Sequence, residues 1–172
     1  SYDEQHEQPD WVMYRLSGDS LALPKYDRRD NFRADNDVPT GSASLADYRR
    51  SGFDRGHLAP AGDFSYNEHA LSETFYMTNM SPQRGSFNRG IWKKLEEQVR
   101  DWAVEFGELF VVTGPVLPDQ ASESIGENAV TVPEFYYKIV LDYEGDEKNA
   151  IAFVLSNEKH SEPLETLSLI HI

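Results

Sequence analysis

The feature of this sequence that most constrains its fold is an apolar stripe over residues 89–106, repeated at the spacing of an α-helix. The stripe ends before Gly107, a residue type that commonly terminates helices. Residues 109–113 then form an apolar run that is typical of a buried strand. A long amphipathic helix followed at once by a buried strand predicts helix-on-sheet packing. The stripe consists of Ile91, Trp92, Leu95, Val99, Trp102, Ala103 and Phe106.

Other segments predict further strands and little additional helix. Residues 11–16, 135–143 and 150–155 are rich in aromatic and aliphatic side chains, and a turn is expected at 144–146 between the last two. A short helix is expected near 67–74, and the polar residues 17–50 predict a long irregular connection of functional importance. These elements indicate an α+β domain with a mainly antiparallel central sheet and one long helix.

Length and composition exclude several classes of protein. A chain of 172 residues that is 39% hydrophobic is expected to form a single domain over residues 1–172. No run of about 18 apolar residues predicts a membrane span. The absence of cysteine excludes disulfides, thiolate nucleophiles and cysteine-ligated zinc.

The net charge of −14 argues against a polyanionic substrate, but the charge is unevenly distributed. Residues 25–100 contain 12 of the 16 Lys and Arg residues and only 11 of the 30 Asp and Glu residues. This part of the chain is therefore neutral to slightly basic, while the acidic residues lie elsewhere. The basic clusters within it are candidates either for substrate contact or for simple solvation.

The segment Asp54-Arg55-Gly56-His57, followed by Asn79 and Asn88, contains the groups most suited to chemistry. A histidine can take a proton from water near neutral pH, and an adjacent arginine favours its neutral form. Arginine also offers planar donors to a phosphate. An amide oxygen suits Mg²⁺, which prefers oxygen ligands and keeps most of its waters. Cleavage of a phosphodiester with one hard metal ion is thus a candidate reaction.

Five ordered blocks of sequence resemble the non-specific DNA/RNA endonucleases, the endonuclease G-like branch of the ββα-metal nucleases with a DRGH signature. They occur in the order of that family over nearly the whole chain. The blocks are residues 51–61, 78–83, 88–96, 113–115 and 132–138.

The resemblance implies a ββα-metal nuclease fold whose long helix carries the metal ligand. It implies that His57 is the general base and that Asn88 is the sole protein ligand of Mg²⁺, with Mn²⁺ as a plausible substitute. A helix N-cap is the competing role for Asn88. On an ideal helix, Glu96 lies about 12 Å along and about 80° around from Asn88, so its carboxylate approaches a metal-bound water rather than the ion. The matching glutamate of the family holds the hydrated ion.

The remaining candidate residues are assigned to substrate binding and to support of the site. Arg55 is the candidate for stabilising transition-state charge. Asp54 is expected to form a salt bridge with Arg55, and Asn79 is expected to tie backbone groups together. Substrate-binding candidates are Arg29, Arg33 and Arg89, with Arg28 not excluded.

These expectations together predict a metal-dependent, sugar-non-specific endonuclease that leaves 5′-phosphate products on DNA and RNA. Two alternatives stay open: a zinc hydrolase using His57, Asp63 and His69, and a catalytically silent nucleic-acid-binding or protein-binding module on the same fold. A protein inhibitor and a homodimer are possible partners. A secreted or periplasmic bacterial location is expected, with a mitochondrial one as the alternative. The end at residues 169–172 predicts that the C-terminal strand and helix of the family are missing.

Overall fold

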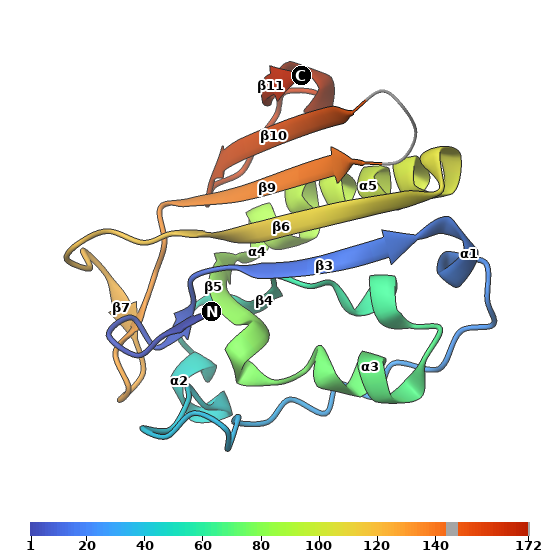
Figure 1. Cartoon of the computed structure of the whole chain (residues 1–172). Helices are drawn as coiled ribbons and strands as arrows, with labels where there is room; N and C mark the ends of the chain where they lie inside the picture. The colour runs from blue at the N-terminus through green and yellow to red at the C-terminus, as the bar shows by residue number, and fades with distance from the viewer. Residues whose placement is uncertain (144–147, 172) are drawn as a thin grey trace.

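The computed structural model describes residues 1–143 and 148–171. Its centre is a five-stranded sheet with the strand order β11-β10-β9-β6-β3, in which every neighbouring pair is antiparallel (Figure 1). The predicted α+β fold with a mainly antiparallel sheet is therefore confirmed. The strands are β3 (Val12–Ser17), β6 (Glu108–Val116), β9 (Phe135–Asp142), β10 (Asn149–Ser156) and β11 (Ser168–His171).

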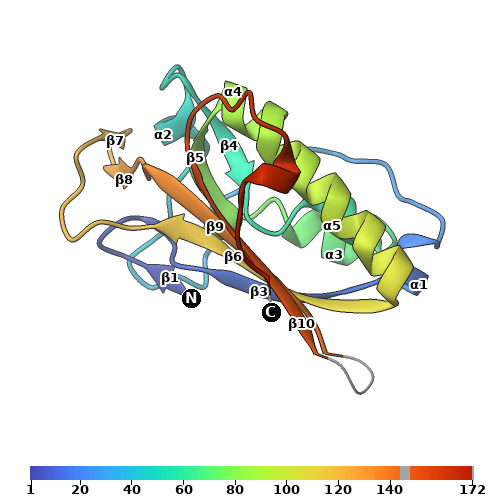
Figure 2. The same ribbon diagram turned by 90° about the horizontal axis from the view of Figure 1, so that it is seen from above.

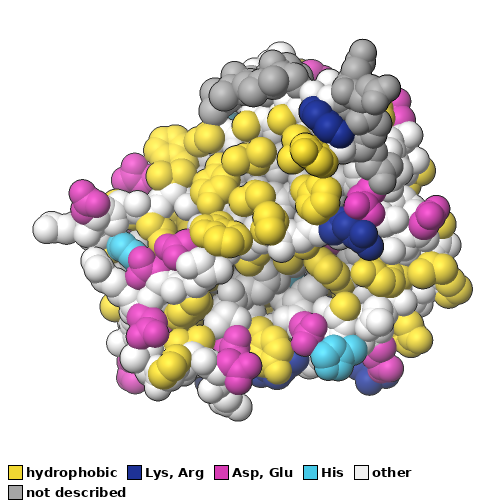
Figure 3. All heavy atoms as spheres, in the orientation of Figure 1, with side chains coloured by type: hydrophobic (Ala, Val, Ile, Leu, Met, Phe, Trp, Pro, Cys, Tyr) yellow, Lys and Arg dark blue, Asp and Glu magenta, His cyan; other side chains and the backbone are white. Residues whose placement is uncertain are grey.

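The long helix α5 (Lys93–Phe106) packs on one face of this sheet (Figure 2). The main core lies between them, and successive strand residues alternate between the core and the outer face. On β9 the inward row contains Tyr136, Lys138 and Val140, all of them buried. Apolar side chains gather on the opposite, outer face (Figure 3), where Ile139 is 40% exposed. Lys138 is thus a charged residue within an otherwise apolar row.

A separate hairpin leads into the helical segment and forms the ββα unit. The DRGH segment lies on β4 (Phe53–His57) and pairs antiparallel with β5 (Met80–Arg84). Gly56 faces Ser81 in this pairing, and a Cβ at Gly56 would stand 2.1 Å from the side chain of Gln83. A larger residue at this position would require the buried side chain of Gln83 to move. Between the strands lie η1 (Ala61–Phe64), the expected short helix α3 (Glu68–Glu73) and η2 (Met77–Asn79).

The helical segment begins earlier than the apolar stripe indicated. Its first turn is α4 (Gly85–Phe87), followed by a π-helical turn η3 (Asn88–Trp92) and then α5. The apolar pattern did not predict this turn, because residues 85–87 contain only one large apolar side chain. Asn88 already has helical dihedral angles, and no side-chain cap is formed in this segment. Asn88 is therefore not an N-cap. Non-helical angles at Gly90 also mean that the ideal-helix spacing from Asn88 to Glu96 does not apply.

The connection over residues 17–50 is mainly irregular, as expected, with two one-turn helices, α1 (Gly18–Leu21) and α2 (Leu45–Tyr48). A bridge between Arg33 and Tyr76 ties this connection to the residues before β5. The turn predicted at 144–146 lies outside the described residues. Among the described helices, none has the length and apolar character needed to cross a bilayer. The minor elements are β1 (Tyr2–Asp3), β2 (Gln8–Pro9), β7 (Ser124–Ile125), β8 (Val130–Thr131) and η4 (Leu164–Thr166).

Candidate active site

A cavity of about 290 Å³ brings together the residues that the sequence assigned to catalysis and metal binding. His57 and Arg55 reach it from β4, and Asn88, Arg89 and Glu96 reach it from the helical segment. The ββα unit thus places one candidate base beside one candidate metal ligand. The cavity is lined by Arg28, Arg55, His57, Pro60, Ala61, Gly62, Asn88, Arg89, Lys93, Glu96 and Arg100.

His57 is held as a neutral, unpaired base. Its ring packs edge-on against Phe32 and Phe75, with ring centroids 5.8 and 5.2 Å away. Its Nε2 atom is buried and has no hydrogen-bond partner in the described part of the chain. Burial, followed by the positive charge of Arg28, lowers the pKa of His57 to about 3. The imidazole is therefore uncharged at neutral pH, with a nitrogen able to accept a proton.

Asp54 holds Asn88 in one orientation. The Nδ2 atom of Asn88 donates to Oδ2 of Asp54 at 3.0 Å, and Arg89 donates twice to the same carboxylate, at 2.8 Å each. Burial opposes ionisation of Asp54, but the bonds from Arg89 and Asn88 outweigh it and hold the pKa of Asp54 below its ordinary value. A carboxylate accepts and does not donate, so the amide nitrogen of Asn88 must face it. The amide oxygen is left without a hydrogen bond among the described residues.

The expected salt bridge between Asp54 and Arg55 does not form. Adjacent strand residues point to opposite faces, so Asp54 turns toward Arg89 while Arg55 stacks over the ring of Phe32 at 4.3 Å. Asn79 makes the contacts expected of a supporting residue. Its side chain accepts from the backbone nitrogen of Ala59 and donates to the Ala59 carbonyl, both at 2.9 Å. These bonds secure the chain immediately after His57.

Glu96 faces the cavity from α5 above a buried network of charges. It forms no hydrogen bond or ion pair within the described residues, whereas Asp63 pairs with Arg100 at 2.7 Å and accepts from Tyr14 at 2.7 Å. Burial raises the pKa of Glu96, and the positive charge of Lys138 is the strongest influence opposing this rise. The carboxylate is thus available to a ligand in the cavity.

Three further cationic residues line the cavity, of which Arg28 was not excluded, Lys93 belongs to a basic cluster that was a candidate for substrate contact, and Arg100 was not selected. Arg28 lines it in place of Arg29 and Arg33, the two neighbours that were chosen. Lys93 and Arg100 also line it. The spacing of Arg100, one helical turn after Glu96, was the signal that could have identified it. Whether Arg29 and Arg33 contact substrate stays a prediction, as do the roles of the other site residues.

The donor set fits one hard, hydrated cation. The free amide oxygen of Asn88 and the unpaired carboxylate of Glu96 are oxygen donors of the kind Mg²⁺ and Mn²⁺ accept, directly or through water. The zinc alternative needs His57, Asp63 and His69 together. Within residues 1–143 and 148–171, no group of three or more His, Asp or Glu side chains is placed to hold a metal. The geometry therefore disfavours the histidine-ligated zinc site.

Comparison with known proteins decides the family. The family model described as DNA/RNA non-specific endonuclease matches residues 1–169. The chain belongs to the DNA/RNA non-specific endonuclease family. The crystal structure of the EndoG/EndoGI complex superposes with a TM-score of 0.90 at 34% identity, covering 99% of this chain and 76% of that one. The structural match confirms the expected ββα-metal nuclease fold. Membership of the family supports metal dependence in general, without identifying the metal.

Curated relatives include Nuclease C1 of Cunninghamella echinulata var. echinulata, 40% identical over 171 residues. That match covers 92% of this chain and 68% of the relative. The mitochondrial Nuclease EXOG of Danio rerio is 36% identical over 170 residues, covering 91% of this chain and 50% of the relative. The chain thus spans between half and about two thirds of the length of these two relatives.

Proposed function

We propose that this domain is a Mg²⁺-dependent endonuclease that hydrolyses phosphodiester bonds of DNA and RNA and leaves 5′-phosphate ends. The observation that carries the proposal is the shared cavity of His57, Asn88 and Glu96. It combines a buried neutral base with two unpaired oxygen donors, and five cationic side chains surround them. Such a lining attracts phosphate in spite of the net charge of −14.

In this mechanism, Nε2 of His57 accepts a proton from the water that attacks phosphorus, in line with the departing 3′ oxygen. Arg55 donates to the phosphate as negative charge develops. Asn88 would hold the metal through its amide oxygen, and Glu96 would orient it by accepting hydrogen bonds from its water ligands. When bound, Mg²⁺ polarises a phosphate oxygen and stabilises the leaving oxygen. Mn²⁺ is a plausible substitute.

Substrate recognition in this cavity is expected to depend on phosphate rather than on sugar. Its polar side chains are mainly cationic donors, which suit phosphate oxygens and carry little base information. A 2′-hydroxyl is then neither required nor excluded. Supercoiled DNA and single-stranded RNA are both expected to be degraded, and strict confinement to one of them would contradict this proposal.

The decisive experiment separates the base from the metal ligand. His57→Ala is expected to lower the cleavage rate by about 10²- to 10⁴-fold, the usual contribution of positioned proton transfer. Mg²⁺ affinity should be unchanged in this variant. Asn88→Ala is expected to weaken Mg²⁺ binding, with partial recovery of rate at high Mg²⁺. Plasmid cleavage is titrated against Mg²⁺, and metal affinity is measured separately by calorimetry.

The control is His69→Ala, because His69 is exposed and pairs only with Glu73 at 3.6 Å among the described residues. Full activity in this variant is expected, whereas its inactivity together with selective rescue by Zn²⁺ would favour the zinc hydrolase. A wild-type protein that binds DNA but does not cleave it in Mg²⁺ or Mn²⁺ would favour the silent binding module. Loss of metal binding in His57→Ala, with Asn88→Ala intact, would refute the assignment of roles.

Partners and location follow from the relatives only as proposals. The EndoG/EndoGI complex is a structure of a related nuclease bound in an inhibited state, which supports the expectation of a protein inhibitor. The homodimer stays a prediction. The names of the relatives give no support to a secreted or periplasmic location, and the mitochondrial label of the Danio rerio nuclease favours the alternative.

A further inference from the structure

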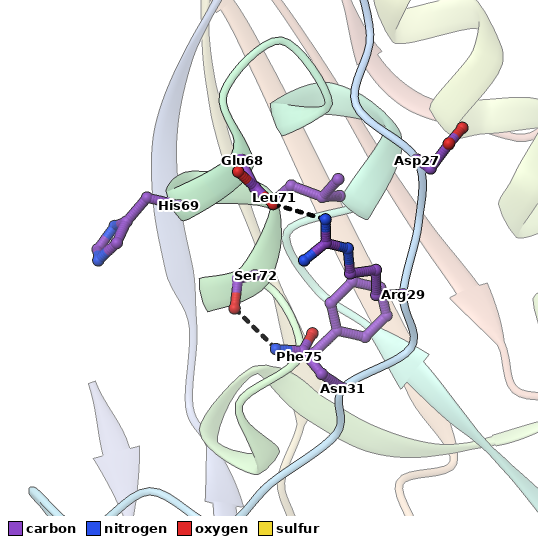
Figure 4. Close-up of a pocket in the computed structure, with 8 residues that line it drawn as sticks. All are labelled: Asp27, Arg29, Asn31, Glu68, His69, Leu71, Ser72 and Phe75. Atoms are coloured by element: carbon purple, nitrogen blue, oxygen red, sulfur yellow. Dashed lines mark hydrogen bonds and ion pairs between the residues drawn. The ribbon is translucent and has the colours of Figure 1, made fainter.

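A second cavity, of about 330 Å³, lies beside α3 (Figure 4). Leu71 and Phe75 contribute apolar wall and are 4% and 0% exposed. Arg29, Asn31 and Ser72 contribute polar groups. In Figure 4 these three side chains converge on the cavity, whereas the side chain of His69 points away. The cavity therefore combines an apolar surface with a few directed polar groups, as small-ligand sites do.

The side chain of Phe75 lies between the second cavity and His57 of the catalytic cavity. Its ring contacts His57 edge-on at 5.2 Å and also lines the second cavity. Arg28 stacks over the same ring at 5.0 Å and lines the catalytic cavity, whereas the next residue, Arg29, lines the second. Neighbouring phosphates of a polynucleotide are joined through one sugar. A nucleotide adjoining the scissile phosphate must therefore lie in space that borders the catalytic cavity.

The charges of the second cavity do not suit a phosphate. Arg29 is already paired with Glu68 at 2.9 Å, and Asp27 adds a further negative charge to the lining. The catalytic cavity also contains paired cations, but its lining has five cationic side chains against one carboxylate, and Arg55 forms no ion pair within the described residues. A polynucleotide backbone therefore follows the catalytic cavity, and an uncharged part of the nucleotide fits the second one.

The polar groups match the edge and the face of a nucleobase. The side-chain nitrogen of Asn31 donates to the hydroxyl of Ser72 at 2.7 Å, while its amide oxygen accepts no hydrogen bond among the described residues. Arg29 donates to Glu68 with its in-plane N–H groups, and its side chain is 76% exposed, so the flat face of the guanidinium can stack on a base while the pair is kept. We infer that this cavity binds the unpaired base of a nucleotide adjoining the scissile phosphate. This inference rests on the proposed function.

A base can enter such a cavity only after it leaves the helical stack. In a duplex this requires unpairing and unstacking, whereas a single strand presents its bases freely. The subsite therefore favours single-stranded DNA or RNA over duplex of the same sequence. It does not distinguish the two sugars, because its contacts are with the base.

The test uses a series of labelled single-stranded DNA 12-mers, each with one abasic residue at a different position. Cleavage is mapped at each bond of every oligonucleotide. Wild-type protein is expected to cleave the bond next to the abasic residue about 5- to 150-fold more slowly, on one side only, which is the usual range for one stacked base. Ser72→Phe fills the cavity, so it should slow cleavage of the intact strand by a similar factor and abolish the abasic effect. Cleavage of a hairpin duplex should be unchanged in this variant.

Glu73→Phe is the matched control, because Glu73 is the next residue of α3 and is exposed. It should behave as wild type. Asn31→Ala is a second, smaller change in case Ser72→Phe does not fold, which circular dichroism melting reveals. Fluorescence anisotropy in EDTA compares a thymidine tetramer with its abasic analogue, independently of cleavage. Tighter binding of the tetramer, lost in the cavity variants, is the expected result.

Uniform cleavage along the abasic series by an active enzyme would overturn the subsite and leave the proposed nuclease function intact. Absence of cleavage would overturn the nuclease function. In that case, equal binding of the tetramer and its abasic analogue would overturn the subsite as well. An equal effect of Glu73→Phe and Ser72→Phe would also count against it.

Discussion

Replacing Lys138 by methionine is expected to stabilise the fold and to impair catalysis. Lys138 is 1% exposed, and its Nζ atom has no hydrogen-bond partner within the described residues. The ammonium lies 4.8 Å from the ring centre of Trp92, which is a weak substitute for water. Burial lowers the pKa of Lys138, opposed in part by Glu96. Methionine has a similar flexible stem and no charge to desolvate.

The sign of the stability change follows from this lowered pKa. A base with a depressed pKa in the folded state binds fewer protons there than in the unfolded chain, so its burial costs stability below its ordinary pKa. Methionine removes that cost at neutral pH. Replacing a whole buried ion pair by apolar side chains is often neutral or stabilising by about 1–4 kcal/mol, and Lys138 has no direct ion pair among the described residues whose loss would offset such a gain. For a domain of this size, each kcal/mol corresponds to a rise in Tm of about 2–4 °C.

The activity should change in the opposite direction because Glu96 loses its strongest positive neighbour. Two unit charges 4 Å apart interact by about 4 kcal/mol at an effective dielectric constant of about 20. Lys138 and Glu96 form no direct ion pair, so about half this value is reasonable. Loss of this attraction raises the pKa of Glu96 further above its ordinary value. The ionised carboxylate needed beside the metal would then appear only at higher pH.

The assay measures kcat/KM for plasmid cleavage from pH 5 to 9, together with thermal unfolding at pH 7. The acid limb of the pH profile should move to higher pH in Lys138→Met, and raised Mg²⁺ should partly reverse the shift. Lys94→Met is the control, because Lys94 lies on the exposed side of α5. An unchanged acid limb of the pH profile would refute the electrostatic coupling between Lys138 and Glu96. A fall in Tm by several degrees would show that the ammonium is paired in solution.

Three further outcomes are expected. Asp54→Ala should weaken Mg²⁺ binding by about 10- to 100-fold, because it frees the amide of Asn88 to rotate; equal affinity in a metal titration would contradict this. The depressed pKa of His57, about 3, contributes stability that is present above its ordinary pKa and is lost as the pH falls toward 3. Between pH 7 and pH 4, the free energy of unfolding should therefore fall by about 2–4 kcal/mol less in His57→Gln than in wild type, as measured by urea unfolding. Raising salt from about 20 to 300 mM should lower cleavage steeply, with close to one unit of log–log slope per phosphate contact. A flat profile would show that the cationic lining does not meet substrate.

The sequence alone determined the elements and the chemical types at the site. Strand and helix patterns predicted the mainly antiparallel sheet and the long helix. These patterns are local, because burial of one face repeats along each element. The start of the helical segment at Gly85 was missed, since its first turn and the π-helical turn around Asn88 have little apolar signal.

Only the tertiary structure decided which charged groups meet. Asp54 faces Arg89 and Asn88 instead of Arg55, and Arg28 enters the catalytic cavity instead of Arg29. These partners come from segments distant in sequence, and the rotation of each side chain depends on packing that no local pattern records. The same holds for Lys138, which lies in the expected strand 135–143 but whose burial without a hydrogen-bond partner among the described residues no sequence pattern indicated. Periodicity specifies which face is buried, whereas the neighbours across that face are set by how the elements pack.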